Sequence, residues 1–202
     1  MARTLAKDHG DKRKAILKTA AKFFADTGYD RAAMSQLAVA CGISKASIYH
    51  YYDSKEALLY GILEHHLTQL LNCIKAVEAG QDDAQIYLRN LVNALLSAYR
   101  GADSEHRLQL EAMRYLGAEQ QAVLATLQRK IVTLFADAIR ASDPELFAQN
   151  PDDLRPITMS LFGMLNWFYM WHQSGKGLTR DEYADIATDI LLGGLTRRAR
   201  SR

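Results

Sequence analysis

Cysteine is scarce in this sequence. Its 202 residues include two cysteines, Cys41 and Cys73, which fall on different expected helices and form no CxxC pair. The N-terminal residues also lack the apolar stretch of a secretory signal. A disulfide framework is therefore not expected, and we expect a cytoplasmic protein with reduced thiols, in which Cys41 is a small core residue.

Long apolar runs and strand patterns are absent as well. No run reaches the roughly 18 residues that a membrane-spanning helix needs, and the longest candidate, residues 159–171, fits a buried helix. The sequence contains no strand pattern, internal repeat or low-complexity segment. With 49% hydrophobic and 24% charged residues, it has the composition of an ordinary globular protein without a membrane partner.

Catalytic and metal-binding motifs are missing too. The sequence has no G-x-S-x-G, Walker or G-x-G-x-x-G pattern, and no set of acid, base and nucleophile can be assembled from it. His65 and His66 are adjacent on an expected helix and point about 100° apart, so they cannot share a metal as an i, i+4 pair does. We expect neither an enzyme nor a protein with a metal or cofactor.

The net charge of +2 conceals an uneven distribution along the chain. Residues 1–60 contain 10 Lys or Arg against 6 Asp or Glu, residues 61–196 contain 11 against 17, and residues 197–202 contain 4 Arg. A basic N-terminal module beside an acidic body favours a polyanionic partner for the module, although a difference of this size also arises by chance. The basic tail is interpreted as a solvated end rather than a binding arm.

Apolar residues recur at helical spacing along nearly the whole chain, which predicts an all-α fold. Gly, Asp, Pro and Ser residues separate the helical segments. The expected helices cover residues 12–28, 34–41, 44–51, 55–79, 83–100, 104–116, 119–141, 153–173 and 180–196.

The stretch GISKASIYHYYDSKEALL, residues 42–59, carries many polar side-chain tips for a core segment. Ala38, Gly42 and Ile48 have the spacing of a helix-turn-helix. This motif needs a small residue where two helices cross, a glycine in the turn and an apolar anchor on the second helix. Ser44 is the expected N-cap of that second helix.

The outer surface of this second helix is predicted to bind DNA. With Ile48 facing inward, the outer side chains combine a charge for phosphate, small residues for close approach and polar tips for base edges. Tyr51 and Tyr52 follow the buried face and are assigned to the core edge. The residues expected at the DNA are Lys45, Ala46, Ser47, Tyr49 and His50, with Lys55 in the first turn of the next helix.

The sequence RKAILKTAAKFFADTGYDRAAMSQLAVACGISKASIYHYYDSKEALL, within residues 12–60, resembles the N-terminal DNA-binding domain of the TetR family of bacterial transcriptional regulators. The resemblance implies a homodimer on a palindromic operator, with a three-helix helix-turn-helix DNA-binding domain in residues 1–56. Residues 57–202 would then form a C-terminal helical effector-binding and dimerisation domain. In this family the fourth helix links the two parts, and the last two helices form a four-helix dimer interface.

The family's DNA contacts fall on Lys45, Ser47, Tyr49, His50 and Lys55 of this sequence. One position departs from the family pattern. The family usually has Thr or Ser at the start of the second helix, where it caps the helix and touches phosphate, whereas this sequence has Ala32 and Ala33. Arg31 and Ser35 are the candidate substitutes.

The last two expected helices carry more apolar surface than one helix pair covers, which predicts a two-fold contact between two copies. The aromatic residues at helical spacing in 167–171 belong to the core or to this interface rather than to a ligand site. The expected interface residues are Ile157, Leu161, Leu165, Phe168, Ile186, Ile190 and Leu191.

The segment LFGMLNWFYMWHQSGKGLTRDEYADIATDILLGGL, residues 161–195, resembles the closing helices of the TetR subgroup that responds to acyl-coenzyme A thioesters. Together with MART and SKASIYHYYDSKEALL, it is similar to repressors of phenylacetate breakdown. The resemblance implies a repressor released by an acyl-coenzyme A, with phenylacetyl-coenzyme A as the first candidate. Arg89, Arg107 and Arg114 are candidates for its phosphates, and surface solvation is the alternative for each.

Two other functions stay open. A multidrug-type repressor would sense lipophilic cations and would place acidic and aromatic groups around its cavity. A DNA-binding dimer without a small-molecule effector would have a closed, well-packed body.

Overall fold

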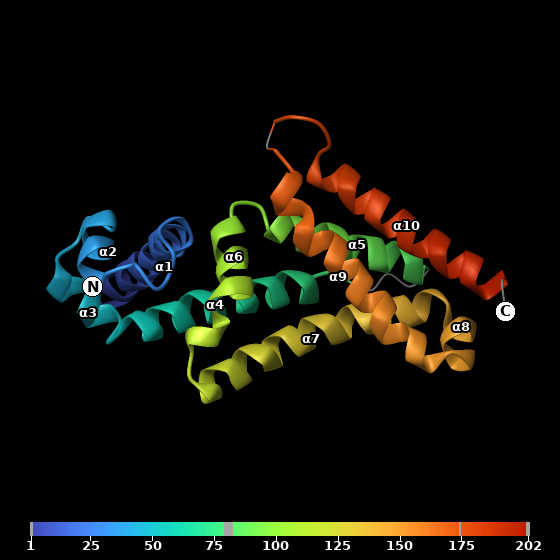
Figure 1. Ribbon diagram of the computed structural model, residues 1–202, viewed down its shortest axis with the longest axis horizontal. Helices are drawn as coiled ribbons and strands as arrows, with labels where there is room; N and C mark the ends of the chain where they lie inside the picture. Colours follow the sequence, from blue (N-terminus) through green and yellow to red (C-terminus); the bar gives the residue numbers. More distant parts are fainter. Residues whose placement is uncertain (1, 79–82, 174, 201–202) are drawn as a thin grey trace. The chain divides into compact units, whose positions relative to one another are not determined.

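The structure is a computed structural model that describes residues 2–78, 83–173 and 175–200, with side chains from residue 10 to residue 199. All regular elements in these ranges are helices, which confirms the all-α fold, and none of them combines the length and apolar composition that crossing a membrane requires. In chain order they are α1 (Ala2–Thr27), α2 (Met34–Ala40), α3 (Lys45–Tyr51), α4 (Lys55–Lys75), α5 (Ala84–Ala98), α6 (Asp103–Glu111), η1 (Met113–Tyr115), α7 (Ala118–Ser142), α8 (Pro144–Gln149), η2 (Pro151–Asp153), α9 (Leu154–Trp171) and α10 (Arg180–Arg200) (Figure 1).

Three features of the helices differ from the expected ones. α1 begins at Ala2 rather than at residue 12, and residues 2–11 contain no proline that would interrupt it. The expected helix over 104–116 is divided into α6 and η1. The apolar pattern does not predict α8, which local chemistry starts: Asp143 accepts a hydrogen bond from the Leu146 N–H at 3.1 Å, and Pro144 occupies the first turn.

The described residues form two compact units. The first combines the residues up to Thr68 with Gly101–Thr126, so α6 and η1 belong to the same unit as α1, against which α6 packs. Burial of each large apolar side chain contributes about 1.5–3 kcal/mol. The fully buried side chains of this unit include Phe24, Leu37, Ile48, Leu58, Leu59 and Leu63.

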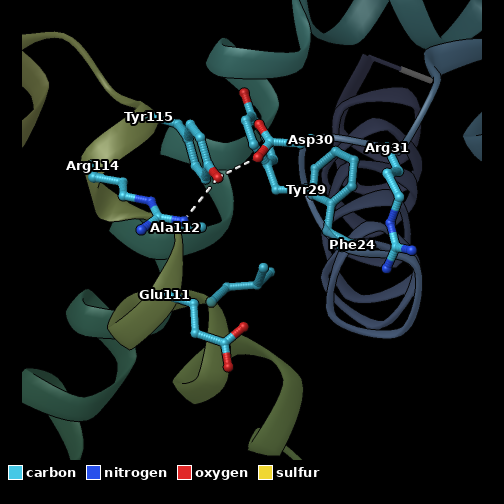
Figure 2. Close-up of a pocket in the computed structure, with 10 residues that line it drawn as sticks. Phe24, Tyr29, Asp30, Arg31, Glu111, Ala112, Arg114 and Tyr115 are labelled. Atoms are coloured by element: carbon cyan, nitrogen blue, oxygen red, sulfur yellow. Dashed lines mark hydrogen bonds between the residues drawn. The ribbon is translucent and has the colours of Figure 1, made fainter.

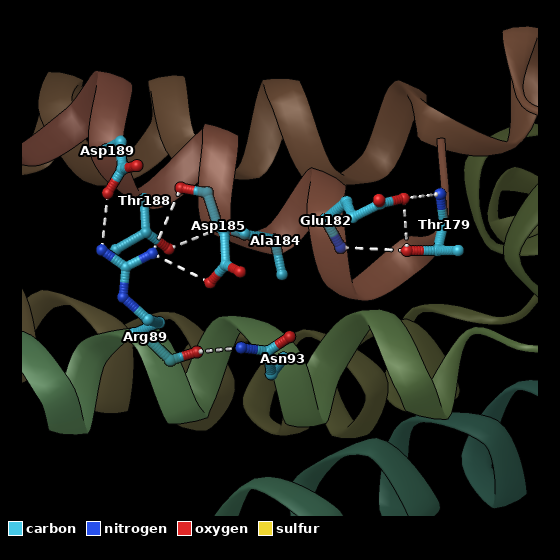
Figure 3. A network of polar contacts seen from close by, with 8 residues as sticks. All are labelled: Arg89, Asn93, Thr179, Glu182, Ala184, Asp185, Thr188 and Asp189. Atoms are coloured by element: carbon cyan, nitrogen blue, oxygen red, sulfur yellow. Dashed lines mark hydrogen bonds and ion pairs between the residues drawn. The ribbon is translucent and has the colours of Figure 1, made fainter. Parts of the chain in front are cut away.

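The second unit contains Gln69–Arg100 and the described residues from Leu127 on. Its most extensive helix pairing is between α5 and α10, and Arg89 of α5 links the two (Figure 3). The Arg89 guanidinium donates to the carboxylates of Asp185 at 2.9 Å and Asp189 at 2.5 Å. α5 and α10 are therefore joined by two ion pairs in addition to their apolar contact.

A capping box fixes the start of α10 (Figure 3). The Thr179 N–H donates to the Glu182 carboxylate at 2.7 Å, and the Glu182 N–H donates to the Thr179 hydroxyl oxygen at 3.2 Å. The hydrogen bonds from Thr179 hold the pKa of Glu182 below its ordinary value, so the carboxylate stays ionised at the positive end of the helix.

The predicted domain boundary between residues 56 and 57 refers to function and stays a prediction. The compact units follow packing, and α4 supplies residues to both of them, with Thr68 in one and Gln69 in the other.

Candidate functional site

The helix-turn-helix frame has the three supports that its sequence predicts. Ala38 is 2% exposed and Ile48 is fully buried, so the small residue and the apolar anchor both face inward. Gly42 has a φ of 66°, a left-handed conformation that a side chain disfavours. The turn is closed by the Ile43 N–H, which donates to the Ala38 carbonyl at 3.0 Å. α3 is thereby held against α2 by local contacts.

Ser44 caps α3 as expected. Its hydroxyl accepts a hydrogen bond from the Ser47 N–H at 3.0 Å and lies 2.8 Å from the Ser47 hydroxyl. The cap stabilises a seven-residue helix that is too short to be stable alone. Ser47, which is half-buried, therefore has a structural partner in addition to its predicted place at the DNA.

The outer face of α3 carries exposed polar groups. Lys45, Ala46, Tyr49 and His50 are exposed, and Tyr49 is 40% accessible. Tyr52 is buried, and burial raises the pKa of its phenol. The expected separation of outward Tyr49 from inward Tyr52 is thus confirmed, so the outer face of α3 is a polar surface.

The start of α2 lacks a side-chain cap. Ala33 occupies the N-cap position without a side-chain hydrogen bond, and Ala32 is buried. Arg31 and Ser35, the candidate substitutes for the family's Thr or Ser, are both exposed. Neither caps the helix, so a compensating role at phosphate stays a prediction for both.

Lys55 has partners within the protein. Its ammonium donates to the carbonyl oxygens of Tyr29 at 2.8 Å, Ala32 at 3.1 Å and Asp30 at 3.3 Å. An ammonium has three N–H donors, and these three carbonyls match that number. A phosphate contact from Lys55 would require the loss of one of these bonds, so the structure gives this lysine a loop-holding role that the sequence pattern does not indicate.

Four of the seven residues expected at a dimer interface face the core of their own unit, which corrects that part of the prediction. Their side chains are enclosed by the other helices of the same chain and cannot meet a second copy. They are Leu161, Leu165, Phe168 and Leu191, all 7% exposed or less. Ile186 and Ile190 are exposed, at 42% and 59%, and Ile157 is half-buried.

α9 also has a second apolar face, which is exposed to solvent. Met159, Trp167, Met170 and Trp171 are 49–58% exposed. Gly163, which lies between the first two on the same face, has open space where a side chain would stand. The spacing of 159, 163, 167 and 170 is helical, and this signal was available in the sequence.

Each of the three arginines proposed for effector phosphates has a partner within the chain, and their assignment to the effector stays a prediction. Hydrogen bonds to Asp189 and Asp185 raise the pKa of Arg89 and hold it between α5 and α10. Arg107 pairs with Glu111 at 3.1 Å within α6. Arg114 donates to the Tyr115 hydroxyl at 3.0 Å. Arg89 belongs to the second unit, whereas Arg107 and Arg114 belong to the first, so the three do not line one site within a single unit.

Two other arginines line one cavity of about 210 Å³ in the second unit, between α7 and α9. Arg140 pairs with Asp137 at 2.8 Å. Arg155 makes no hydrogen bond or ion pair within the described part of the chain. Val132 and Leu154 add an apolar lining. Neither arginine lies in a recognisable motif, so the sequence alone does not single them out.

His66 and His106 form a buried pair between α4 and α6, with ring centroids 6.4 Å apart. Burial, with smaller contributions from His106 and His65, lowers the pKa of His66 to about 3. The described residues contain no group of three or more His, Cys, Asp or Glu side chains placed to hold a metal. His66 therefore stays neutral across the physiological pH range.

Two family profiles match the chain. The family described as "Bacterial regulatory proteins, tetR family" matches residues 16–61, and "Tetracyclin repressor-like, C-terminal domain" matches residues 81–195. The chain is 25% identical over 186 residues to "HTH-type transcriptional repressor KstR2" of Rhodococcus jostii (strain RHA1), and the match covers 91% of each chain. The profiles include the helix-turn-helix and most of the body.

Solved structures are similar over nearly the whole chain. A TetR-family transcriptional regulator from Bordetella parapertussis 12822 is 30% identical with a TM-score of 0.83, covering 89% of this chain and 93% of that one. AibR, solved in complex with isovaleryl coenzyme A and operator DNA, is 28% identical with a TM-score of 0.74, covering 90% and 98%. These similarities extend through both compact units.

Proposed function

This chain belongs to the TetR family of bacterial transcriptional regulators, and from that premise we propose that it is a homodimeric repressor released from its operator by an acyl-coenzyme A thioester. It is a DNA-binding transcriptional regulator rather than an enzyme, because the matched families and relatives are transcriptional regulators. One observation carries the proposal: α3 is anchored by buried Ile48 and presents exposed Lys45, Tyr49 and His50 on its outer face.

The outer face of α3 has the chemistry of a major-groove contact. Ala46 is small enough for the helix to approach base edges, while the Tyr49 and His50 tips can donate or accept hydrogen bonds. Lys45 supplies a charge for phosphate. We assign Lys45, Ser47, Tyr49 and His50 to DNA, with Arg31 and Ser35 as phosphate contacts at the start of α2.

The exposed apolar face of α9 and α10 supports a dimer. Trp167 at 58%, Met170 at 55% and Ile190 at 59% are more exposed than such side chains usually are in a monomer. The exposed glycines 163, 193 and 194 have open space where side chains would stand, so helices of a second copy can approach closely. A two-fold pairing would place two recognition helices roughly 34–36 Å apart or somewhat more, on successive major grooves.

The effector assignment rests on similarity and on charge. AibR, which is similar over 90% of this chain, was solved with isovaleryl coenzyme A. The cavity beside Arg140 and Arg155 offers two guanidinium groups next to apolar side chains, a combination that suits phosphates followed by an acyl chain. A lipophilic cation would instead require an excess of carboxylates, and Asp137 is the single acidic residue that lines this cavity.

The proposed switch requires unequal affinities for two states. An effector releases the operator only if it binds the DNA-incompetent state more tightly, and each 1.4 kcal/mol of difference changes the equilibrium about tenfold. Free phenylacetate lacks the phosphates that Arg140 and Arg155 would hold. It is therefore expected to release DNA much less effectively than phenylacetyl-coenzyme A.

Calorimetry and operator release test the effector. The ligands are phenylacetyl-coenzyme A, isovaleryl-coenzyme A, a long-chain acyl-coenzyme A, free coenzyme A, phenylacetate and a lipophilic cation, with an operator selected from random duplexes. We expect an acyl-coenzyme A to bind and release DNA, and Arg155→Gln to weaken its binding about tenfold or more, since a charge-assisted bond contributes roughly 1.5–3 kcal/mol. Arg100→Gln, at an exposed arginine of the second unit, is the matched control.

The other outcomes separate the alternative functions. Binding and release by the cation alone would establish a multidrug-type repressor. Operator binding that no ligand changes at about millimolar concentration would leave a DNA-binding dimer without an effector of this class.

A further inference from the structure

A cavity of about 240 Å³ lies within the first unit, between the end of α1 with its following loop and the α6–η1 segment. Figure 2 shows the Tyr115 hydroxyl between the Asp30 carboxylate and the Arg114 guanidinium. Tyr115 donates to Asp30 and accepts from Arg114. No residue of the α3 outer face lines this cavity, and neither do Arg140 and Arg155; among the residues assigned to DNA above, Arg31 alone lines it.

The volume limits what can enter. A cavity of about 150 Å³ admits benzene, and drug-sized ligands occupy about 300–1,000 Å³. At about 240 Å³ this cavity accepts a molecule with one ring or a short branched chain and one polar group. The cavity beside Arg140 and Arg155 is no larger, at about 210 Å³, so a coenzyme A thioester bound there would keep its nucleotide outside, and the two sites differ in their lining rather than in their size.

The walls suit an apolar body. The Tyr29 ring lies 5.4 Å from Phe24 and 4.9 Å from Tyr115, measured between centroids, so three aromatic side chains are continuous. Buried Leu108 and Ala112 line the α6 side. Burial of an aromatic or branched aliphatic group against these side chains would stabilise the complex by about 25 cal/mol per Å² of apolar area removed from water.

Of the four charged residues that line the cavity, Arg31 is the one without a hydrogen bond or ion pair in the described part of the chain. The two carboxylates of the cavity already have partners, because Asp30 accepts from Tyr115 and Glu111 pairs with Arg107 at 3.1 Å. Arg31 lies over Gly28 and makes no hydrogen bond or ion pair in the part of the chain that the structure describes. A guanidinium has five N–H donors, so an anion can bind Arg31 without displacing an existing ionic partner.

We propose that this cavity binds a small monocarboxylate with an aromatic or branched apolar body. Arg31 is its ionic partner, Arg114 is a second donor, and the aromatic wall holds the apolar part. Arg31 lies three residues before α2 begins at Met34, so a bound carboxylate engages a guanidinium that is also assigned to operator phosphate. A bound carboxylate is therefore expected to lower operator affinity through Arg31. This effect rests on the proposed DNA-binding function, but the existence of the site does not depend on it.

Three probes with one ring and different charge test the site on the full chain: benzoate, benzamide and benzylamine. Isothermal titration is expected to give about millimolar affinity for benzoate, in keeping with its few heavy atoms. Benzylamine is expected to bind at least tenfold more weakly. Arg31→Gln and Arg114→Gln should each weaken benzoate binding, the former about tenfold, while Arg100→Gln, which removes the same charge elsewhere, should leave it unchanged.

Arg31 and Arg114 are exposed, so these variants are expected to fold, and a thermal melt checks this. No heat from benzoate at about 20 mM, tighter binding of benzylamine, or benzoate affinity that both variants retain would overturn the proposal. Phenylacetyl-coenzyme A binding to the Arg31→Gln variant tests whether the two sites are distinct. If this variant loses benzoate binding but still binds phenylacetyl-coenzyme A, there are two sites. If it loses both ligands, the two sites are not distinct. Failure of phenylacetyl-coenzyme A to bind the unmodified chain bears on the proposed effector alone.

Discussion

Lys55 and Tyr29 are joined twice: the Lys55 ammonium lies 4.4 Å from the centroid of the Tyr29 ring and donates a hydrogen bond to the Tyr29 carbonyl at 2.8 Å. Burial, together with the Glu56 and Asp30 carboxylates, raises the pKa of Tyr29 to about 12. The phenol is therefore neutral at physiological pH, and its ring faces a cation. This contact ties the first turn of α4 to the loop that leads into α2.

Replacing Lys55 with methionine keeps the aliphatic stem and removes the ammonium. We expect Lys55→Met to lower the free energy of unfolding by about 2 kcal/mol, because partly buried carbonyls lose a charged donor. Urea denaturation measures the change. Lys22→Met is the control, since the exposed pair of Lys22 with Asp26 contributes about 0.5 kcal/mol, and equal losses in both variants would contradict the loop-holding role.

Substitutions on α3 are expected to separate affinity from specificity. Lys45→Ala should weaken binding to all sequences and reduce the salt dependence by about one phosphate contact per site. His50→Ala should instead change the preferred operator, at a cost of about 1–3 kcal/mol for the original one. Fluorescence anisotropy across salt concentrations and operator variants measures both effects.

Lys130→Ala, at an exposed lysine of α7, is the control for lost charge. It should leave the operator preference and the salt slope unchanged. If Lys45→Ala and His50→Ala behave like this control, α3 does not contact DNA.

A carboxylate on the exposed face of α10 is expected to separate a dimer. Ile190→Asp would place a charge in the proposed interface, where desolvation costs several kcal/mol. Sedimentation velocity should show a dimer for the unmodified chain at micromolar concentration and a monomer for this variant. Leu110→Asp is the matched control on α6, at 54% exposure against 59% for Ile190, and equal masses for the two variants would contradict the assignment of the face.

Arg89 is expected to stabilise the fold rather than bind the effector. Its side chain is 32% exposed and its two ion pairs are partly screened, so Arg89→Ala should lower the free energy of unfolding by about 1–2 kcal/mol. The loss should shrink at about 1 M salt. Calorimetry should give unchanged acyl-coenzyme A affinity, whereas a selective loss of that affinity would restore Arg89 to the effector site.

His66 predicts a loss of stability in mild acid. The unfolded side chain binds a proton below about pH 6.5, while the folded one, with a pKa of about 3, does not. The unfolded state therefore binds more protons between these values, and the free energy of unfolding falls by about 1.4 kcal/mol for each pH unit below 6.5.

Urea denaturation at pH 7.5 and 5.5 measures this effect. His66→Gln should remove about 1.4 kcal/mol of the pH dependence. His172→Gln, at a histidine stacked on Phe168, should retain it. Identical pH dependence in the unmodified chain and in His66→Gln would show that another group is responsible.

The DNA-binding head was predictable because its determinants are local. Ala38, Gly42 and Ile48 lie within a short stretch, and the φ of Gly42 and the cap on Ser44 follow from residue chemistry alone. The burial of Tyr52 and the exposure of Tyr49 also follow from helical period.

The body was less predictable because its partners are distant in sequence. Arg89 meets carboxylates 96 and 100 residues further along, which no local pattern indicates. α9 is apolar on two faces, and only tertiary packing decides that Phe168 enters the core while Trp167 remains outside. The seven residues predicted for the dimer interface therefore include both core residues and exposed ones.

The first unit is assembled from two separated stretches of chain, and this sets the order of events during synthesis. α1, α2 and α3 leave the ribosome first, but the α6 surface that covers α1 arrives only with Gly101–Thr126. At about 5–20 residues per second, the intervening synthesis takes roughly 3–12 s. During that interval the face of α1 that later packs against α6 is open to water and to chaperones, so the N-terminal module, although made first, completes its packing only after translation has passed Thr126.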